Sequence, residues 1–303
     1  GVLISPQAIC THPCCRPMKL GAHVSVAGGL HNGVAEALAI GADTFQMFSK
    51  NQRQWIAKPL TDDQRDQFRT ALAESGLGPV MIHDSYLINM GSPDETKGKR
   101  AQHAFLEEYR RCEALGVPYL NFHPGSHTHP NKVMRDDHAT REAALERIAG
   151  HINTTLAKTE GFESLLVLEN AAGQGTNVGI TFGELAHILE RVDDPSRMGV
   201  CIDTQHAWAA GYDWGDYDGV WTEFDSLIDR ERLVGMHLND SLSDRGSRVD
   251  RHANHGEGKL GESVFASIMQ DSRLEDVAGY LETPGGPDRW RPEIARLREL
   301  AER

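Results

Sequence analysis

One pattern occurs eight times along the chain: a short apolar run, a loop, and a longer stretch whose apolar residues have helical spacing. Val, Leu, Ile and Phe dominate the apolar runs, which is typical of strands buried in a parallel sheet. Alternating strands and helices predict parallel strands joined by right-handed crossovers. Eight such units within 303 residues predict an α/β fold, the eight-stranded (β/α)8 TIM barrel. The predicted strands are residues 18–25, 43–49, 79–85, 118–125, 164–170, 198–204, 233–240 and 278–283.

Helix signals between these runs support the same architecture. Thr61 and Gln64 have capping-box spacing before a stretch that ends at Gly76, and Thr181 and Glu184 repeat that spacing. Helical periodicity also marks the segments 101–116, 139–161 and 291–303. An open doubly wound sheet is the alternative, but VAGGL at 26–30 is a weak match to a phosphate-binding turn. We therefore expect one catalytic barrel domain over residues 18–303.

Composition limits the classes of partner. A formal net charge of −13 argues against unspecific nucleic-acid binding, although cations held in a cleft would reverse the local sign. No window approaches the roughly 18 apolar residues of a spanning helix, so we expect no membrane partner and a cytoplasmic protein, associated with the nucleoid if bacterial. Five cysteines, an odd number, do not suggest a disulfide framework, and Cys112 and Cys201 lie in apolar patterns typical of buried side chains.

Residues 1–17 differ from the rest of the chain, with three of the five cysteines and no acidic residue. We interpret them as a disordered extension or a remnant of processing or of a tag, preceding a natural start at Met18. Organellar targeting and a metal site at His12, Cys14 and Cys15 are the alternatives that this segment leaves open.

Polar side chains stand at the carboxyl end of each predicted strand. A barrel brings these ends together on one face. So many ionisable groups in one partly buried cavity would repel each other or remain desolvated unless a cation held them. The pattern therefore predicts a metal site formed from strand ends. In chain order these residues are His23, Gln46, His83, His123, Glu169, Asp203, His237 and Glu282.

The stretch GSRVDRH at 246–252 adds Asp250 and His252, one residue apart, which places them on the same side of an extended segment. It follows the seventh predicted strand, and His206 follows Asp203 by three residues, so all three can reach the same face. A set of five imidazoles and four carboxylates suits zinc better than magnesium or calcium. Nine ligands exceed the need of one ion and indicate a cluster of two or three. The set is His83, His123, Glu169, Asp203, His206, His237, Asp250, His252 and Glu282.

These motifs resemble the endonuclease IV family, zinc-dependent apurinic/apyrimidinic endonucleases of DNA base-excision repair. The resemblance runs in order from about Met18 to the C-terminus. Two positions depart from the family pattern: Gln205 stands where a Cys is usual, and Trp208 where a Phe is usual. Neither is a ligand position. The motifs are HDSYLIN (83–89), NFHPGSH (121–127), LENAAGQG (168–175), CIDTQHAWAAGYD (201–213), HLNDS with GSRVDRH and GEG (237–258), and LET (281–283).

The resemblance implies three zinc ions per chain, with Mn²⁺ at one subsite as an alternative. His83 and His123 would hold the first ion, and Glu169 would bridge it to the second. Asp203, His237 and Glu282 would complete the second subsite, and His206, Asp250 and His252 would hold the third. Glu169 and Glu282 are the expected catalytic carboxylates. The implied reaction cuts duplex DNA 5′ to an abasic site, leaving a 3′-hydroxyl and a 5′-deoxyribose phosphate, with 3′-end trimming as a further activity.

The loops are expected to choose the substrate. The resemblance assigns Arg53, Tyr86 and Leu87 to insertion into the base stack, which costs least where a base is missing. Packing within the loops is the other reading of these three residues. Basic side chains near the same face could contact phosphates: Lys50, Arg245, Arg248, Arg251 and Lys259. We interpret His255 and Glu257 as loop structure, and we expect a monomer acting on abasic duplex DNA.

Two other functions compete with this interpretation. A sugar isomerase or epimerase on the same barrel would use one or two divalent ions, but would leave Asp250, His252 and the Arg53 loop unexplained. A non-catalytic module that binds damaged DNA would not require so complete a ligand set. Metal content and nicking of an abasic duplex distinguish the three.

Overall fold

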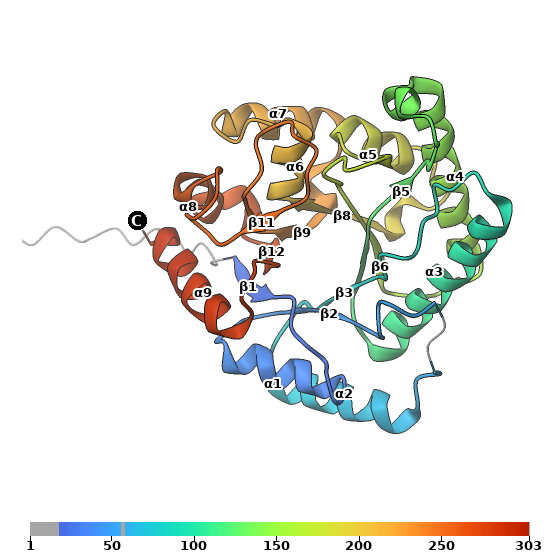
Figure 1. The fold of residues 1–303 in the computed structure, drawn as a ribbon. Helices are drawn as coiled ribbons and strands as arrows, with labels where there is room; N and C mark the ends of the chain where they lie inside the picture. The colour runs from blue at the N-terminus through green and yellow to red at the C-terminus, as the bar shows by residue number, and fades with distance from the viewer. Residues whose placement is uncertain (1–17, 56–57, 303) are drawn as a thin grey trace, which may run out of the picture.

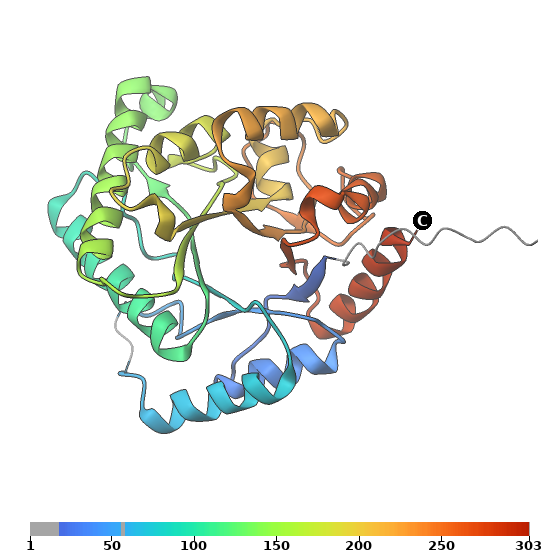
Figure 2. The same ribbon diagram turned by 180° about the vertical axis from the view of Figure 1, so that it is seen from behind.

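The predicted barrel is confirmed. The computed structural model describes residues 18–55 and 58–302, so the prediction for residues 1–17 lies outside the described part. Helices surround a central ring of strands in Figure 1, and the view from behind shows the same arrangement (Figure 2). The barrel strands are β1 (Lys19–Ala22), β2 (Gln46–Phe48), β3 (Met81–His83), β4 (Tyr119–Phe122), β6 (Leu165–Glu169), β8 (Met198–Asp203), β9 (Leu233–His237) and β12 (Ala278–Leu281).

All neighbouring barrel strands pair in parallel, in the order β1-β12-β9-β8-β6-β4-β3-β2. A single parallel bridge between His23 and Gln46 joins β1 to β2 and nearly closes the ring. Two short antiparallel pairs lie outside the barrel: β5 (Gly125–Ser126) with β7 (Asn177–Val178), and β10 (Asp240–Ser241) with β11 (His252–Ala253).

The outer layer consists of helices that follow the strands. Short 3-10 helices precede or follow some of them: η1 (Lys132–Asp136), η2 (Pro195–Arg197), η3 (Arg230–Arg232) and η4 (Ser272–Leu274). In the described residues, no helix is both long enough and apolar enough to span a membrane. The α-helices are α1 (His31–Ala39), α2 (Asp62–Ser75), α3 (Glu95–Leu115), α4 (His138–Ala157), α5 (Phe182–Leu189), α6 (Thr204–Ala210), α7 (Tyr217–Leu227), α8 (Glu262–Gln270) and α9 (Pro287–Ala301).

Local capping explains where several helices begin. Thr61 and Gln64 form the predicted capping box of α2, which ends at Gly76 in the left-handed conformation. Helix α3 begins six residues before the predicted segment, because Asp94 accepts a hydrogen bond from the Lys97 amide at 2.9 Å. Its first turn is polar and exposed, so apolar periodicity did not mark it.

The predicted box at α5 forms only in part. Thr181 caps the Glu184 amide at 3.2 Å, but the Glu184 carboxylate accepts from the backbone of Gly179 and Ile180 at 2.8 and 2.9 Å. The same carboxylate binds the Arg141 guanidinium in a two-pronged pair at 2.7 and 2.8 Å. Glu184 therefore fastens the turn before α5 to helix α4.

Replacing Glu184 by alanine should lower the free energy of unfolding by about 3–5 kcal/mol, because Arg141 would keep a largely buried charge without its partner. Chemical denaturation would measure the change. Glu190→Ala, which alters an exposed carboxylate at the end of the same helix, should change it by less than about 0.5 kcal/mol. Equal effects of the two substitutions would contradict the anchoring role.

Two groups of buried apolar side chains hold the fold. The larger group fills the layer between the sheet and the helices. The smaller group comes from strands β3, β6, β8 and β12 and fills the interior of the ring, as barrel interiors require. It includes Met81, Val167, Cys201, Ala278 and Tyr280. Cys112 and Cys201 are free and buried, as the sequence predicted.

Candidate metal centre

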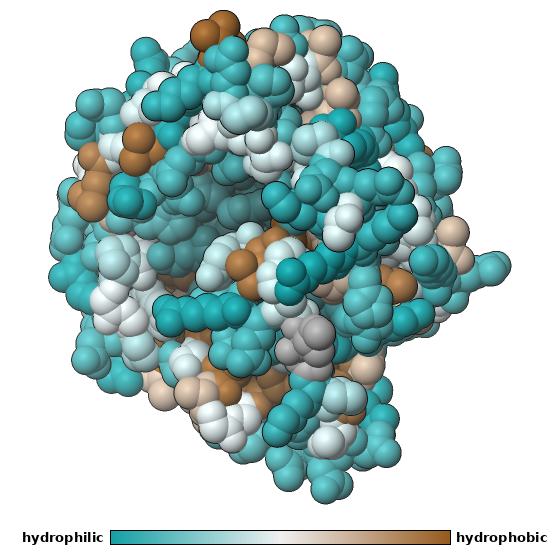
Figure 3. Space-filling view, turned by 45° about the vertical axis from the view of Figure 1, so that its right-hand side comes forward, coloured by the Kyte–Doolittle hydropathy of each residue, from teal (hydrophilic) through white to brown (hydrophobic). Residues whose placement is uncertain are grey.

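The predicted ligands converge at the carboxyl ends of the strands. Glu169, Asp203 and His237 are the last residues of β6, β8 and β9, and His83 is the last residue of β3. Asp203 and His237 are direct partners in the parallel register, so their side chains start side by side. A space-filling view shows a hollow with mainly hydrophilic walls (Figure 3). Parallel pairing, rather than local sequence, brings these residues together.

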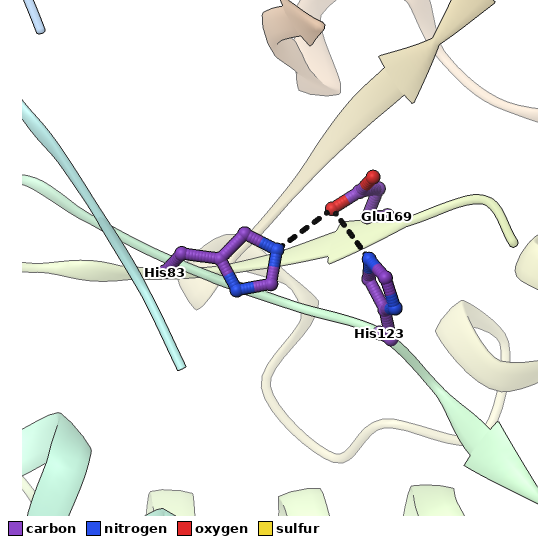
Figure 4. A group of neighbouring side chains, drawn as sticks. All are labelled: His83, His123 and Glu169. Atoms are coloured by element: carbon purple, nitrogen blue, oxygen red, sulfur yellow. Dashed lines mark ion pairs between the residues drawn. The ribbon is translucent and has the colours of Figure 1, made fainter. Parts of the chain in front are cut away.

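The first group of side chains consists of His83, His123 and Glu169 (Figure 4). Both histidines direct Nε2 at the same carboxylate oxygen: His83 at 3.3 Å and His123 at 3.2 Å from Glu169 Oε2. Glu169 is fully buried. Two ring nitrogens and one carboxylate oxygen at one point form a donor set suited to zinc.

The second group surrounds His237. Its Nδ1 lies 3.0 Å from Glu169 Oε1, 3.4 Å from Glu282 Oε2 and 3.7 Å from Asp203 Oδ2. Glu169 therefore contributes one oxygen to each of the first two groups, which is the geometry of a bridging carboxylate. Three carboxylates around one ring nitrogen require a cation, either a proton or a metal ion.

The third group forms around the start of helix α6. Asp203 is the N-cap of this helix and accepts from the His206 amide at 2.9 Å, which fixes His206 in the first turn. His206 Nε2 lies 3.4 Å from Asp250 Oδ2, and His252 Nε2 lies 3.3 Å from Asp250 Oδ1. Asp203 Oδ2 lies 3.6 Å from the same His252 nitrogen. The Asp-x-His pair of the sequence thus reaches the same face as the strand ends.

The histidines and carboxylates in this cavity stabilise each other's charged forms. Burial opposes protonation of His206, but Asp203 and Asp250 outweigh it and raise the pKa of this imidazole well above its ordinary value. Burial also opposes ionisation of Glu169, yet His237 and His123 hold the pKa of its carboxyl well below its usual range. A divalent ion entering the cavity would therefore compete with protons on the histidines.

Hydrogen bonds orient three of the histidines that are predicted as ligands. His83, His206 and His252 each place Nδ1 beside a backbone carbonyl, at 2.9, 2.9 and 3.2 Å from the oxygens of Asp84, Asn170 and Glu282. A ring that donates from Nδ1 presents its Nε2 lone pair to the cavity, as ligating histidines do. The Nε2 atoms of His206 and His252 are buried and have no hydrogen-bond partner among the described residues. The donor set fits divalent zinc.

Three buried asparagines hold the predicted carboxylate ligands by their side chains or backbone, and sequence reasoning missed them. Asn121 donates to Glu169 Oε2 at 2.5 Å, and Asn239 donates to Asp203 Oδ2 at 2.8 Å. Asn170 accepts from the Asp203 amide at 2.7 Å. Each asparagine lies within two residues of a predicted ligand in the motifs NFH, LEN and HLND. That adjacency was the available signal.

The two departures from the family pattern both contact the loop that carries Asp250. Gln205 donates to the Val249 carbonyl at 3.0 Å and lies 3.2 Å from the Ser241 hydroxyl. The Trp208 indole donates to the Ser243 carbonyl at 3.1 Å. These side chains therefore tie α6 to residues 241–249, and the group around Asp250 remains assembled.

Two loops carry the wedge residues, Arg53, Tyr86 and Leu87, which are predicted to insert into the base stack. Arg53 is exposed, and its amide donates to Asn51 Oδ1 at 2.9 Å. Tyr86 is 65% exposed, one of the most exposed large side chains, and Leu87 is half-buried. The Ser85 hydroxyl donates to the Gln52 carbonyl at 2.6 Å, so one hydrogen bond joins the two loops.

Comparison with known proteins identifies the family of this chain. A family profile described as a xylose isomerase-like TIM barrel matches residues 34–300. The chain is 49% identical over 285 residues to the "Probable endonuclease 4" of Phocaeicola vulgatus, which covers 93% of this chain and 99% of that protein. The chain belongs to the endonuclease IV family. The chain is therefore a DNA-cleaving hydrolase, and the resemblance drawn from the motifs is confirmed.

Solved structures agree with this assignment. The endonuclease IV of Thermus thermophilus matches with a TM-score of 0.81 and 35% identity, over 94% of this chain and 99% of that chain. A D-tagatose 3-epimerase-like protein matches with a TM-score of 0.72 and 15% identity, over 94% and 97% of the two chains. At that identity the likeness shows the barrel fold alone.

The basic residues of this endonuclease IV homologue are less free than the sequence suggested. Lys50 keeps only 6% of its side chain exposed and pairs with Glu108 at 3.3 Å, so its ammonium is not available to a phosphate. Arg245 pairs with Asp213, and Arg248 pairs with Asp136. Arg251 is exposed and donates to the Asp250 carbonyl at 2.8 Å. Lys259 pairs with Asp244.

The residues interpreted as loop structure do hold a loop. His255 Nε2 lies 2.7 Å from the Leu238 carbonyl, and Glu257 pairs with Arg289. Asp240 accepts from the amides of Gly256, Gly258 and Leu260 at 3.0, 3.1 and 2.9 Å. This loop packs beside the metal centre without adding a ligand.

Proposed function

We propose that this chain is an abasic-site endonuclease that hydrolyses the phosphodiester 5′ to the lesion in duplex DNA. The products are a 3′-hydroxyl and a 5′-deoxyribose phosphate, and trimming of blocked 3′ ends is a further activity. The observation that carries the proposal is the convergence of nine predicted ligands on Glu169, Asp203 and Asp250 in a member of the endonuclease IV family. Residues 18–303 act as one catalytic domain, as a monomer, in the cytoplasm.

The nine ligands divide into three zinc subsites, with Mn²⁺ as an alternative at one of them. Support comes from three groups whose donor atoms lie within 4.8 Å of one another: His83, His123 and Glu169; Glu169, Asp203 and His237; and Asp203, His206 and His252. Glu282 lies 3.4 Å from His237, and Asp250 lies 3.4 and 3.3 Å from His206 and His252. The first subsite takes His83, His123 and Glu169. The second takes Glu169, Asp203, His237 and Glu282, and the third takes His206, Asp250 and His252.

Zinc held by these residues would lower the pKa of a water molecule to near neutral pH. It would also supply positive charge that stabilises the negative charge of the phosphate. The protein residues do the rest. Glu169 holds its two oxygens toward different groups because Asn121 and His237 each contact one of them. Glu282 keeps 18% of its side chain exposed, and we assign its carboxylate the role of a proton acceptor.

Arg53, Tyr86 and Leu87 select the substrate by entering the base stack at the missing base. Their exposure and the hydrogen bond between their loops support this role. Arg251 donates to a backbone carbonyl and has no carboxylate partner among the described residues, so it can contact a phosphate. Arg245 and Arg248 would first have to leave their carboxylate partners. Lys50 holds its loop through Glu108 instead.

Replacing Arg53 by alanine should reduce the preference for abasic over undamaged duplex about tenfold, or about 1.4 kcal/mol, with a smaller change in kcat. The reason is that the wedge acts before the chemical step. Steady-state nicking rates on both duplexes would measure it. Arg69→Ala, on the outer helix α2, should change neither rate; if Arg53→Ala behaves like that control, the wedge assignment is wrong.

The deciding experiment is a nicking assay on a duplex with a single abasic analogue, paired with elemental analysis of the same preparation. We expect cleavage on the 5′ side of the analogue and two to three zinc ions per chain. Binding without nicking by zinc-replete protein would favour a damaged-DNA-binding module. About one manganese per chain without nicking would favour the sugar epimerase.

A further inference from the structure

Two of the eight strand-end residues have no place in the ligand set. His23 directly follows β1, whereas Gln46, predicted at the carboxyl end of its strand, is the first residue of β2. The single bridge that joins β1 to β2 pairs these two residues. Gln46 is fully buried, and His23 is mostly buried. A buried polar side chain beside a candidate metal centre requires a reason.

Gln46 contacts two of the ligands directly. Its Oε1 lies 2.7 Å from His237 Nε2, and its Nε2 lies 2.7 Å from Glu282 Oε1. The second amide hydrogen faces His23 Nδ1 at 2.8 Å. The reverse orientation of the carboxamide would place two acceptor oxygens 2.7 Å apart. Chemistry therefore dictates which end of the amide faces His237.

This orientation determines which nitrogen of His237 faces the metal centre. Because Gln46 Oε1 only accepts, His237 Nε2 must carry a hydrogen. The other nitrogen, Nδ1, is the one that faces Glu169 at 3.0 Å and Glu282 at 3.4 Å. His83, His206 and His252 have a backbone carbonyl in this role, on the opposite ring nitrogen. His237 instead has the side chain of Gln46 in this role, and a substitution can remove that side chain.

The same amide orients the carboxylate of Glu282. Oε1 accepts from Gln46, and His23 Nδ1 lies 3.2 Å from the same oxygen. Oε2 is left to face His237 Nδ1. One side chain thus determines both the ring orientation of one ligand and the free oxygen of another.

We propose that Gln46 is a positioning residue of the second subsite: it fixes the Nε2–H tautomer of His237 and directs Glu282 Oε2 into the site. The proposal rests on the proposed function, since it requires that this subsite binds a metal ion. Loss of such an orienting partner typically weakens metal affinity or activity about 10- to 100-fold.

The test is Gln46→Met, which keeps the length of the side chain and removes its hydrogen bonds to His237, Glu282 and His23. A matched control is Gln102→Met: Gln102 Oε1 lies 2.6 Å from His151 Nδ1 between α3 and α4, in another part of the molecule. Zinc-loaded proteins are mixed with a chromophoric chelator, and the rate of release of each ion is measured. Gln46→Met should release one ion about 10- to 100-fold faster and lower kcat with little change in KM. Gln102→Met should match the wild type.

Two results would overturn the proposal. One is that Gln46→Met releases its ions at the wild-type rates. The other is that Gln46→Met and Gln102→Met each release all their ions at one common rate. If Gln46→Met does not fold, ring ¹⁵N NMR of the native zinc-loaded protein decides. The ring signals of His237 are assigned by comparison with those of the histidines that do not contact Gln46. A His237 Nε2 that binds a metal ion, or that carries no hydrogen, contradicts the proposal. Wild-type protein that binds no divalent ion would instead refute the proposed function.

Discussion

Replacing Glu282 by glutamine should reduce nicking of an abasic duplex by about 10²–10⁴-fold, while binding of that duplex stays measurable. The substitution keeps the shape of the side chain but removes the charge beside His237 Nδ1, 3.4 Å away. The substitution also replaces one carboxylate oxygen by an amide nitrogen, which cannot accept a hydrogen bond. In the wild type, Gln46 donates to Glu282 Oε1 at 2.7 Å. Single-turnover nicking and a gel-shift titration would separate the chemical step from binding.

Glu257→Gln is the control for this experiment. Glu257 lies in the neighbouring loop and pairs with Arg289, without contact to the metal centre. It should retain wild-type turnover. Unchanged turnover in Glu282→Gln would show that this carboxylate has been assigned the wrong role, and loss of duplex binding would indicate a wider structural effect.

The fold was predictable because barrel strands are buried on both faces and therefore read as apolar runs. The carboxyl ends of those runs also indicated the metal centre, since parallel pairing places them on one face. Asp250 and His252 required one further step, the observation that their loop follows the seventh strand. All nine predicted ligands lie in the three convergent groups or, for Asp250 and Glu282, in contact with them.

The surroundings of the site were harder to predict, because they depend on pairs far apart in the sequence. Lys50 meets Glu108 from helix α3, and Arg248 meets Asp136 from η1. No local sequence pattern predicts such pairs. Basic residues that the sequence suggested were available to phosphates therefore proved to be paired with carboxylates. Gln46 shows the same limit: the sequence placed it at a strand end, but only its contact with His237, 191 positions away, suggests its role.

Removal of metal with a strong chelator should abolish nicking, and added zinc should restore it. The reason is that water at neutral pH is too weakly ionised to attack a phosphodiester unless a cation lowers its pKa. Without metal, the cavity would balance its carboxylates by protonating histidines such as His206, whose pKa is raised. The apolar core does not depend on the ions, so we expect the metal-free chain to remain folded.

Metal-free protein should nevertheless unfold at a lower temperature, because an ion that binds only the folded state stabilises it, by about 4 kcal/mol at a thousandfold excess over Kd. Circular dichroism melts with and without added zinc would measure the shift. Magnesium is the control ion: an oxygen-preferring cation should neither restore nicking nor raise the melting temperature at a site with five imidazoles. Full nicking after exhaustive chelation would contradict the zinc mechanism, since an activated water is the nucleophile on which that mechanism depends at neutral pH.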